Sequence, residues 1–166
     1  MILALAIVAL VAAQRLIELV YARRNTQALL ARGATEVAGG HYPLFVALHA
    51  AWLISIVLAL PKDPVIHWLP LAAYAVLEML RVWTVLSLGP YWTTRILTLP
   101  EAPLIKRGPY RFVRHPNYLI VAGEIALLPL VFGEIWVAIA FTVLNAGLLA
   151  WRIRAEDAAL APRRTL

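Results

Sequence analysis

The sequence predicts an all-α integral membrane protein with five transmembrane helices. Hydrophobic residues make up 63% of the 166 residues and charged residues only 14%, and the mean hydropathy is +0.79. Soluble domains contain roughly 45–50% apolar residues, so lipid is the expected solvent for most of this chain. The charged residues are bunched between long apolar stretches, which is the pattern of membrane spans.

Five apolar stretches define the expected spans of a single membrane-embedded domain, residues 1–166. They cover residues 1–22, 44–60, 64–88, 116–133 and 135–151. Most have about the length needed to cross a hydrocarbon core of roughly 30 Å. The first lacks a basic leader, so we expect a retained helix rather than a cleaved signal peptide. The connections at 61–63 and 133–134 are short, which predicts two tight antiparallel hairpins.

Basic residues predict the orientation in the cytoplasmic membrane. With five spans, Lys62 lies on one side, and twelve basic residues lie on the other: Arg23, Arg24, Arg32, Arg95, Lys106, Arg107, Arg111, Arg114, Arg152, Arg154, Arg163 and Arg164. Cytoplasmic loops hold the excess of Lys and Arg, so the N-terminus is expected outside and the C-terminus inside. This topology also explains the net charge of +6, so we expect no nucleic-acid partner. The absence of Cys excludes disulfides and thiolate metal sites.

Charged residues occur inside three of the expected spans. Arg15 and Glu18 are three residues apart, as are Glu78 and Arg81, so each pair shares one helix face. For the first pair, neutralisation near the membrane interface is the favoured interpretation. The second pair is expected either to line a cavity or to neutralise itself in the same way. Glu124 has no opposite charge within one turn, so it is either protonated or paired with a cation from another segment.

The stretch "GPYRFVRHPNYL" at 108–119 precedes the fourth span. Proline disfavours helix in the residue before it and suits the first turn of a helix, so we expect His115 outside the helix and Pro116 at its start. The free N–H groups of that turn offer a site for an anionic group, with His115 and Asn117 at its rim and Tyr118 projecting from the first turn. The alternative is an interfacial belt in which Tyr and Arg anchor a helix end at lipid headgroups.

A second polar cluster follows the fifth span in "LLAWRIRAEDAAL" at 148–160. Arg152 and Glu156 are four residues apart and share one helix face, which by itself also fits a solvated ion pair. In a hairpin, however, this exit lies beside the entry at His115. The two ends together offer a helix N-terminus and arginines for a carboxylate, and Glu156, Asp157 and aromatic rings for a cation. A small zwitterion with an additional positive centre suits such a site.

This constellation resembles the isoprenylcysteine carboxyl methyltransferase family of membrane methyltransferases, which also includes phospholipid N-methyltransferases. The matching pattern is "LIKRGPYRFVRHPNYL" at 104–119 in the form G-x-Y-x-x-x-R-H-P-x-Y, followed by the R-x-x-x-E-[ED] ending at 152–157. The blocks "RLIELVYARRN", "HYPLFVALHAAWL" and "LRVWTVLSLGPYWTTRI" in the first half look like a bacterial branch that accompanies type III polyketide synthases. Some members of that branch methylate alkylpyrone-like products.

The resemblance implies that S-adenosyl-L-methionine binds at the cytosolic face, between the loop before the fourth span and the end of the fifth. It implies the following cofactor-binding residues: Leu104, Ile105, Lys106, Gly108, Tyr110, His115, Pro116, Asn117, Tyr118 and Glu156. His115 and Tyr118 would hold the methionine end, Glu156 its ammonium, and residues 104–106 the adenine. Arg152 and Glu156 are the implied catalytic residues, with Arg152 near the acceptor. Arg81, Glu78, Glu124 and Trp92 are candidate acceptor-binding residues.

The implied activity is O-methylation of a carboxylate or acidic enol on a lipophilic acceptor, alkylpyrone-like or prenylcysteine-like, that enters from the bilayer. Contacts with membrane lipids are expected, and the oligomeric state is left open. One alternative is a methyltransferase acting on a phospholipid or another amine. The other is a non-catalytic haem or quinone carrier that uses His49 or His115 as a ligand, although a lone intramembrane histidine is more often a packing residue.

Overall fold

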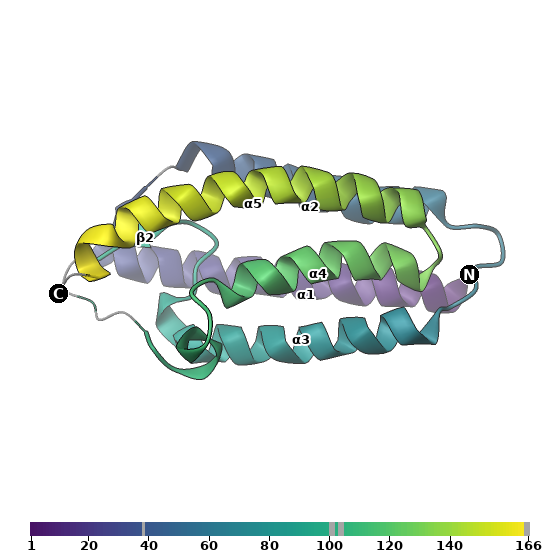
Figure 1. Cartoon of the computed structure of the whole chain (residues 1–166), viewed down its shortest axis with the longest axis horizontal. Coiled ribbons are helices and arrows are strands. Elements are labelled where there is room, and N and C mark those ends of the chain that lie inside the picture. The colour runs from purple at the N-terminus through teal and green to yellow at the C-terminus, as the bar shows by residue number, and fades with distance from the viewer. Residues whose placement is uncertain (38, 100–101, 103–104, 165–166) are drawn as a thin grey trace.

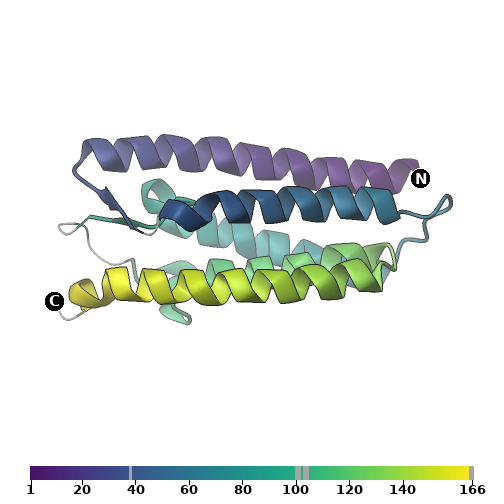
Figure 2. The same ribbon diagram turned by 90° about the horizontal axis from the view of Figure 1, so that it is seen from above.

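The computed structural model describes residues 1–37, 39–99, 102 and 105–164, and its helices form a bundle along one common axis (Figures 1 and 2). The two termini lie at opposite ends of the bundle. The five α-helices are α1 (Ile2–Ala31), α2 (Tyr42–Ala59), α3 (Trp68–Leu88), α4 (Pro116–Val131) and α5 (Ile135–Arg164). The short 3-10 helices are η1 (Gly39–His41), η2 (Gly89–Tyr91) and η3 (Gly108–Arg111).

Four of these helices, α1, α2, α3 and α5, are long and apolar enough to cross a membrane, and α4 is a shorter apolar helix of 16 residues. Large hydrophobic side chains cover the outside of the bundle, as at Leu58 and Leu69, which are 80% and 83% exposed. Such a surface is unfavourable in water and favourable in hydrocarbon. The expected all-α membrane architecture is therefore confirmed.

Helix α4 occupies the centre of the packing. It packs against α3 on one side and α5 on the other, and α5 also contacts α2. The expected hairpin of the fourth and fifth spans is present, but that of the second and third is wrong, since α2 packs on α5 and α1 instead of along α3. The physical reason is the connection at 60–67, which is long enough to reach α4. There the His67 N–H donates to the carbonyl of Val131, the last residue of α4 (2.8 Å), so α3 begins beside α4.

Helices α1 and α5 are longer than the apolar stretches that predict them. Helix α1 continues nine residues past 22, and α5 thirteen residues past 151. Nothing in α1 stops the helix before Gly33, whose φ of +87° suits glycine and whose N–H donates to the Leu30 carbonyl (3.0 Å). Both helices therefore carry polar turns beyond the membrane at the same end of the molecule.

A small cap closes that end of the bundle. Strand β1 (Thr35–Glu36), after α1, pairs antiparallel with β2 (Leu97–Thr98), with Thr35 opposite Thr98. The Arg95 guanidinium lies 2.8 Å from a Glu36 carboxylate oxygen. A minor apolar cluster under the cap consists of Leu29, Ala34, Leu99 and Ala102. The cap thus ties the end of α1 to the segment that leads toward α4.

The apolar core fills the half of the bundle near the N-terminus. Trp52 and Ile56 of α2 and Ile125 and Leu128 of α4 are almost fully buried. The Trp52 indole N–H donates to the Ile125 carbonyl (3.2 Å), which satisfies the polar atom of a buried ring. His49, one turn earlier in α2, hydrogen bonds through Nδ1 to the Phe45 carbonyl (2.8 Å) and meets Trp52 edge-on.

A charged network crosses the interior between α1, α3 and α4. Arg81 donates from Nε and Nη2 to Glu18, each at 2.6 Å, and from Nη1 to Glu124 at 2.9 Å. Arg15 donates to Glu124 at 2.7 Å and to Glu18 at 3.3 Å. Gln14 donates to Glu78, which lies 3.9 Å from Arg15. We refer to these six side chains as the interhelical network.

The interhelical network corrects the interpretation of Arg15 and Glu18 as local neutralisation at the interface. The pair does form, but both side chains also reach partners on other helices. Spacing along one helix reports only the neighbours on that helix, so these partners could not be read from the pattern. Of the two possibilities for Glu124, the structure shows cations from two other helices within hydrogen-bonding distance.

Candidate functional site

The site begins at the N-terminus of α4, which starts where the proline predicts. His115 caps the helix with φ −127° and ψ 60°, and Pro116 is the first helical residue. The Tyr118 N–H bonds back to the His115 carbonyl at 3.1 Å, which fixes the first turn. Sequence reasoning located this helix start correctly because proline restricts its predecessor.

The loop before α4 is held against the end of α3. Gly108 has φ +57°, and a Cβ there would overlap the Ser87 hydroxyl and lie 3.3 Å from Trp83 Nε1. Arg107 Nε donates to the Ser87 carbonyl at 2.8 Å. Gly108 is therefore required both for its left-handed backbone and for the close approach of η3 to α3.

We expect Gly108→Ala to loosen this loop more than Gly33→Ala loosens the end of α1. Both glycines have positive φ, but a Cβ at Gly33 meets nothing within 4 Å. Strain alone should cost Gly33→Ala about 1–2 kcal/mol, and overlap with Ser87 should cost Gly108→Ala roughly 1–3 kcal/mol more. Chemical unfolding and limited proteolysis at residues 105–115 measure both effects. Equal losses for the two variants would contradict the close-packing explanation.

Two residues of α4 meet two carboxylates of α5. Tyr118 donates its hydroxyl proton to Glu156. His115 Nε2 lies 3.1 Å from Asp157 Oδ1, and His115 Nδ1 lies 3.8 Å from Glu156 Oε1. The His115 and Tyr118 rings stack with centroids 5.3 Å apart. The start of α4 and the end of the apolar part of α5 thus converge on one set of polar groups.

Arg152 joins this cluster from one turn earlier in α5. Its Nε donates to the Tyr118 hydroxyl (2.8 Å) and its Nη2 to the Thr94 carbonyl (2.8 Å). Its guanidinium carbon lies 5.2 Å from the centre of the Phe45 ring and 5.6 Å from that of Tyr118, within the range of cation–π attraction. Arg152 is buried, with 8% of its surface exposed, so its charge acts in a region of low dielectric.

Segment 89–94 bridges α1 and the cluster. Asn25 of α1 donates to the carbonyls of Gly89 (3.1 Å) and Trp92 (2.8 Å), and Trp92 stacks on Tyr21 at 5.9 Å. Two residues after Trp92, the Thr94 carbonyl accepts a hydrogen bond from Arg152. Sequence reasoning missed Asn25, and it could not have identified Thr94, because a backbone carbonyl carries no residue-specific signal.

Tyr110 belongs to η3 and lies near Glu156. Burial raises the pKa of its hydroxyl well above the usual value, and the negative charge of Glu156 raises it further. Tyr110 therefore stays protonated at physiological pH. It offers the site a neutral hydrogen-bond donor.

The candidate residues fall into two separate groups. Those of the polar cluster at the start of α4 lie together: Tyr110, His115, Pro116, Asn117, Tyr118, Arg152 and Glu156. Glu78, Arg81 and Glu124 instead contact the other charges of the interhelical network. Ile105 is half-buried and Lys106 exposed, and Leu104 lies outside the described residues.

The cluster combines one guanidinium, two carboxylates, an imidazole and two phenols within one region. The buried Oδ1 of Asn117 has no hydrogen-bond partner among the described residues. A buried acceptor without a donor is costly, and this oxygen is free to accept one more hydrogen bond. The carboxylates suit an ammonium group, and the guanidinium suits an anionic oxygen.

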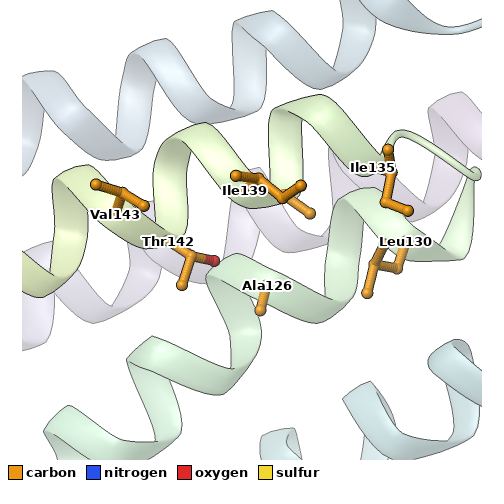
Figure 3. A pocket seen from close by; sticks show the side chains of 7 residues that line it. Ala126, Leu130, Ile135, Ile139, Thr142 and Val143 are labelled. Atoms are coloured by element: carbon orange, nitrogen blue, oxygen red, sulfur yellow. The ribbon is translucent and has the colours of Figure 1, made fainter.

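An apolar groove of about 300 Å³ lies between α4 and α5, farther along the bundle. Figure 3 shows its lining, which is formed by Ala126, Leu130, Ile135, Ala138, Ile139, Thr142 and Val143. Ile139 and Val143 are more than half exposed. The groove therefore opens on the outside of the bundle, toward the lipid.

Comparison with known proteins gives one family and two relatives. The model of the isoprenylcysteine carboxyl methyltransferase (ICMT) family matches residues 68–162. The Bacillus subtilis (strain 168) protein named Uncharacterized protein YpbQ is 40% identical over 158 residues, which cover 93% of this chain and 94% of that protein. An uncharacterized protein of Haemophilus influenzae is 25% identical over 143 residues, or 83% of each chain. No solved structure matches the chain.

Proposed function

Because the chain belongs to the isoprenylcysteine carboxyl methyltransferase family, whose members are membrane methyltransferases that use S-adenosylmethionine, we propose that it O-methylates a lipophilic acceptor held in the bilayer. The favoured acceptor carries a carboxylate or an acidic enol, as in an alkylpyrone or a prenylcysteine. The observation that supports this most directly is the convergence of His115 and Tyr118 with Arg152 and Glu156.

The residues of this cluster fit S-adenosylmethionine. Glu156 and Asp157 offer negative charge for an ammonium group, and the unpartnered Oδ1 of Asn117 can accept one more hydrogen bond. His115 and Tyr118 would hold the methionine end, and residues 104–106 the adenine. The donor, when bound, supplies a methyl group on a positively charged sulfur.

The chain's own contribution is to position the acceptor and exclude water. Arg152 is fixed by Tyr118 and Thr94, so its guanidinium can orient an anionic oxygen at little entropic cost. Such an oxygen is already ionised at neutral pH, so the reaction needs no general base. An amine acceptor would need to lose a proton first, which is why O-methylation is favoured.

We propose that all five helices cross the cytoplasmic membrane, with α4 as the shortest span and the cluster on the cytosolic side. The excess of basic residues in the connections on the same side as the C-terminus supports this orientation. The acceptor would enter from the lipid, and the groove between α4 and α5 offers an apolar surface for its chain. That Glu78, Arg81, Glu124 and Trp92 contact the acceptor stays a prediction. Arg81 pairs with Glu124, and Glu78 lies beside Arg15.

A labelled-methyl assay tests the proposed activity. Purified protein with methyl-labelled S-adenosylmethionine should label alkylpyrones or prenylcysteines as esters or enol ethers. Label appearing on phosphatidylethanolamine instead would favour N-methylation. A Soret band in the absorbance of the purified protein, without methyl transfer, would support the haem carrier.

Binding of the methyl donor should depend on the cluster. We expect His115→Ala to weaken binding of S-adenosylhomocysteine, measured by calorimetry, by about 10-fold or more, because hydrogen bonds to charged groups contribute roughly 1.5–3 kcal/mol. His67→Ala, which changes an exposed histidine at the other end of the bundle, is the control. Unchanged affinity in His115→Ala would remove the assignment of the cluster as the donor site.

A further inference from the structure

Glu134 is a buried carboxylate at the end of the bundle opposite the polar cluster. It lies in the connection between α4 and α5 and is 8% exposed. Neither of its carboxylate oxygens has a hydrogen-bond partner within the part of the chain that the structure describes. Burial raises the pKa of Glu134 to about 7. A buried carboxylate without donors is unfavourable, so this residue requires an explanation.

Glu134 borders a hollow of about 440 Å³. The other lining residues are almost all apolar: Ala59, Pro61, Phe132, Gly133, Ile135, Trp136 and Val137. The hollow therefore combines one carboxylate with two aromatic rings. Phe132 is 4% exposed and Trp136 80%, so Trp136 presents the accessible ring. A carboxylate beside an aromatic ring is a suitable surface for an organic cation.

The surroundings place the hollow at the level of lipid headgroups. Trp68 at the start of α3 and Trp136 at the start of α5 are 68% and 80% exposed at this end. Exposed tryptophans at the ends of apolar helices typically mark the membrane interface. A carboxylate at this depth meets headgroups, of which those with an ammonium group have the complementary charge.

The other titratable groups at this end are the amino group of Met1, Lys62, Asp63 and His67. Lys62 and Asp63 lie exposed in the connection between α2 and α3. The His67 ring lies close to Gly133, where a Cβ would be 3.3 Å from Nε2. Neither Lys62 nor His67 hydrogen bonds to Glu134 in the described structure.

We propose that the Glu134 hollow binds the ammonium group of an aminophospholipid headgroup. Such a group brings three N–H donors and one positive charge to a carboxylate whose two buried oxygens have no donor, and the Glu134 side chain turns toward the hollow to meet it. A divalent metal ion fits less well, because calcium and magnesium require several oxygen ligands and the lining supplies one carboxylate. The bound lipid would brace the connection between α4 and α5. This site does not depend on the methyl-transfer proposal.

The test compares the thermal stability of the full-length protein in detergent with added phosphatidylethanolamine or phosphatidylglycerol of the same chains. Phosphatidylethanolamine should raise the Tm of the wild type and of Asp63→Asn, an exposed acidic control at the same end. In Glu134→Gln, which keeps the size of the side chain, its apparent affinity should fall by about 10-fold or more. Glu134→Asp, which keeps the charge, should retain part of the preference.

Three outcomes would overturn the proposal. The first is an undiminished preference for phosphatidylethanolamine in Glu134→Gln. The second is equal stabilisation by glycerophosphoethanolamine, which lacks acyl chains and would indicate a soluble amine. The third is stabilisation by calcium or magnesium that Glu134→Gln abolishes, without any effect of phosphatidylethanolamine.

The pH dependence gives an independent readout. Without the lipid, the folded protein binds the Glu134 proton more tightly than the unfolded chain does, so the wild type should lose stability as pH rises from about 4.5 to about 7. Glu134→Gln removes this contribution. Bound phosphatidylethanolamine favours the ionised carboxylate and should flatten the loss. A slope that is the same in Glu134→Gln and wild type would contradict the assignment.

Discussion

Replacing Arg152 by lysine should lower methyl transfer by about 100-fold or more, although the positive charge is kept. Arg152 donates in two directions at once, from Nε to the Tyr118 hydroxyl and from Nη2 to the Thr94 carbonyl. A lysine ammonium has no fixed fork and cannot hold both partners from one position. Removing a preorganised group that stabilises charge at a reacting centre typically costs 10²- to 10³-fold in kcat.

The measurement is steady-state kinetics with an alkylpyrone acceptor, together with calorimetric binding of S-adenosylhomocysteine. Donor affinity should change little in Arg152→Lys, since the carboxylates of Glu156 and Asp157 remain, whereas kcat should fall. Arg154→Lys changes an exposed arginine two residues away and is the matched control. Wild-type kcat in Arg152→Lys would exclude an active role for the guanidinium.

Replacing Arg81 by methionine should destabilise the protein by about 3–5 kcal/mol, because it leaves buried carboxylates without their partner. Arg81 holds both oxygens of Glu18 and one oxygen of Glu124. Glu124 would keep Arg15 at 2.7 Å, whereas Glu18 would keep it only at 3.3 Å. The loss should therefore be concentrated on the contact between α1 and α3.

Unfolding in mixed micelles, followed by circular dichroism, measures this loss. Arg95→Met is the control, because Arg95 pairs with Glu36 at the surface with 40% of its side chain exposed, and such pairs contribute only about 0–1 kcal/mol. If Arg81→Met lost no more stability than Arg95→Met, the interhelical network would not be a main source of stability.

The sequence was sufficient for the local features of the site and for the class of fold. Apolar stretches predicted the helices, and the restriction that proline places on its predecessor located the start of α4 at Pro116. The two-residue connection between the last two spans placed His115 near Glu156, which the structure shows 3.8 Å apart. These inferences succeeded because each rests on short-range geometry.

Contacts between distant segments were not predictable in the same way. The pairing of Arg15 with Glu124 joins residues 109 positions apart, and no periodicity within one helix indicates it. The approach of Gly108 to Ser87 depends on how η3 packs on α3. The length of α1 was underestimated because Arg23 and Arg24 resemble a loop by charge, although arginine is a good helix former.

The interhelical network determines how this protein can be divided. The family match begins at residue 68, yet Arg15, one of the two cations that Glu124 meets, comes from α1. A fragment starting at α3 would retain Glu78, Arg81 and Glu124 but would lack Arg15. Its part of the network would then carry two negative charges and one positive charge. We therefore expect that the part matched by the family model does not fold as an autonomous module, and that a chimera with foreign N-terminal helices needs Arg15 and Glu18 as well.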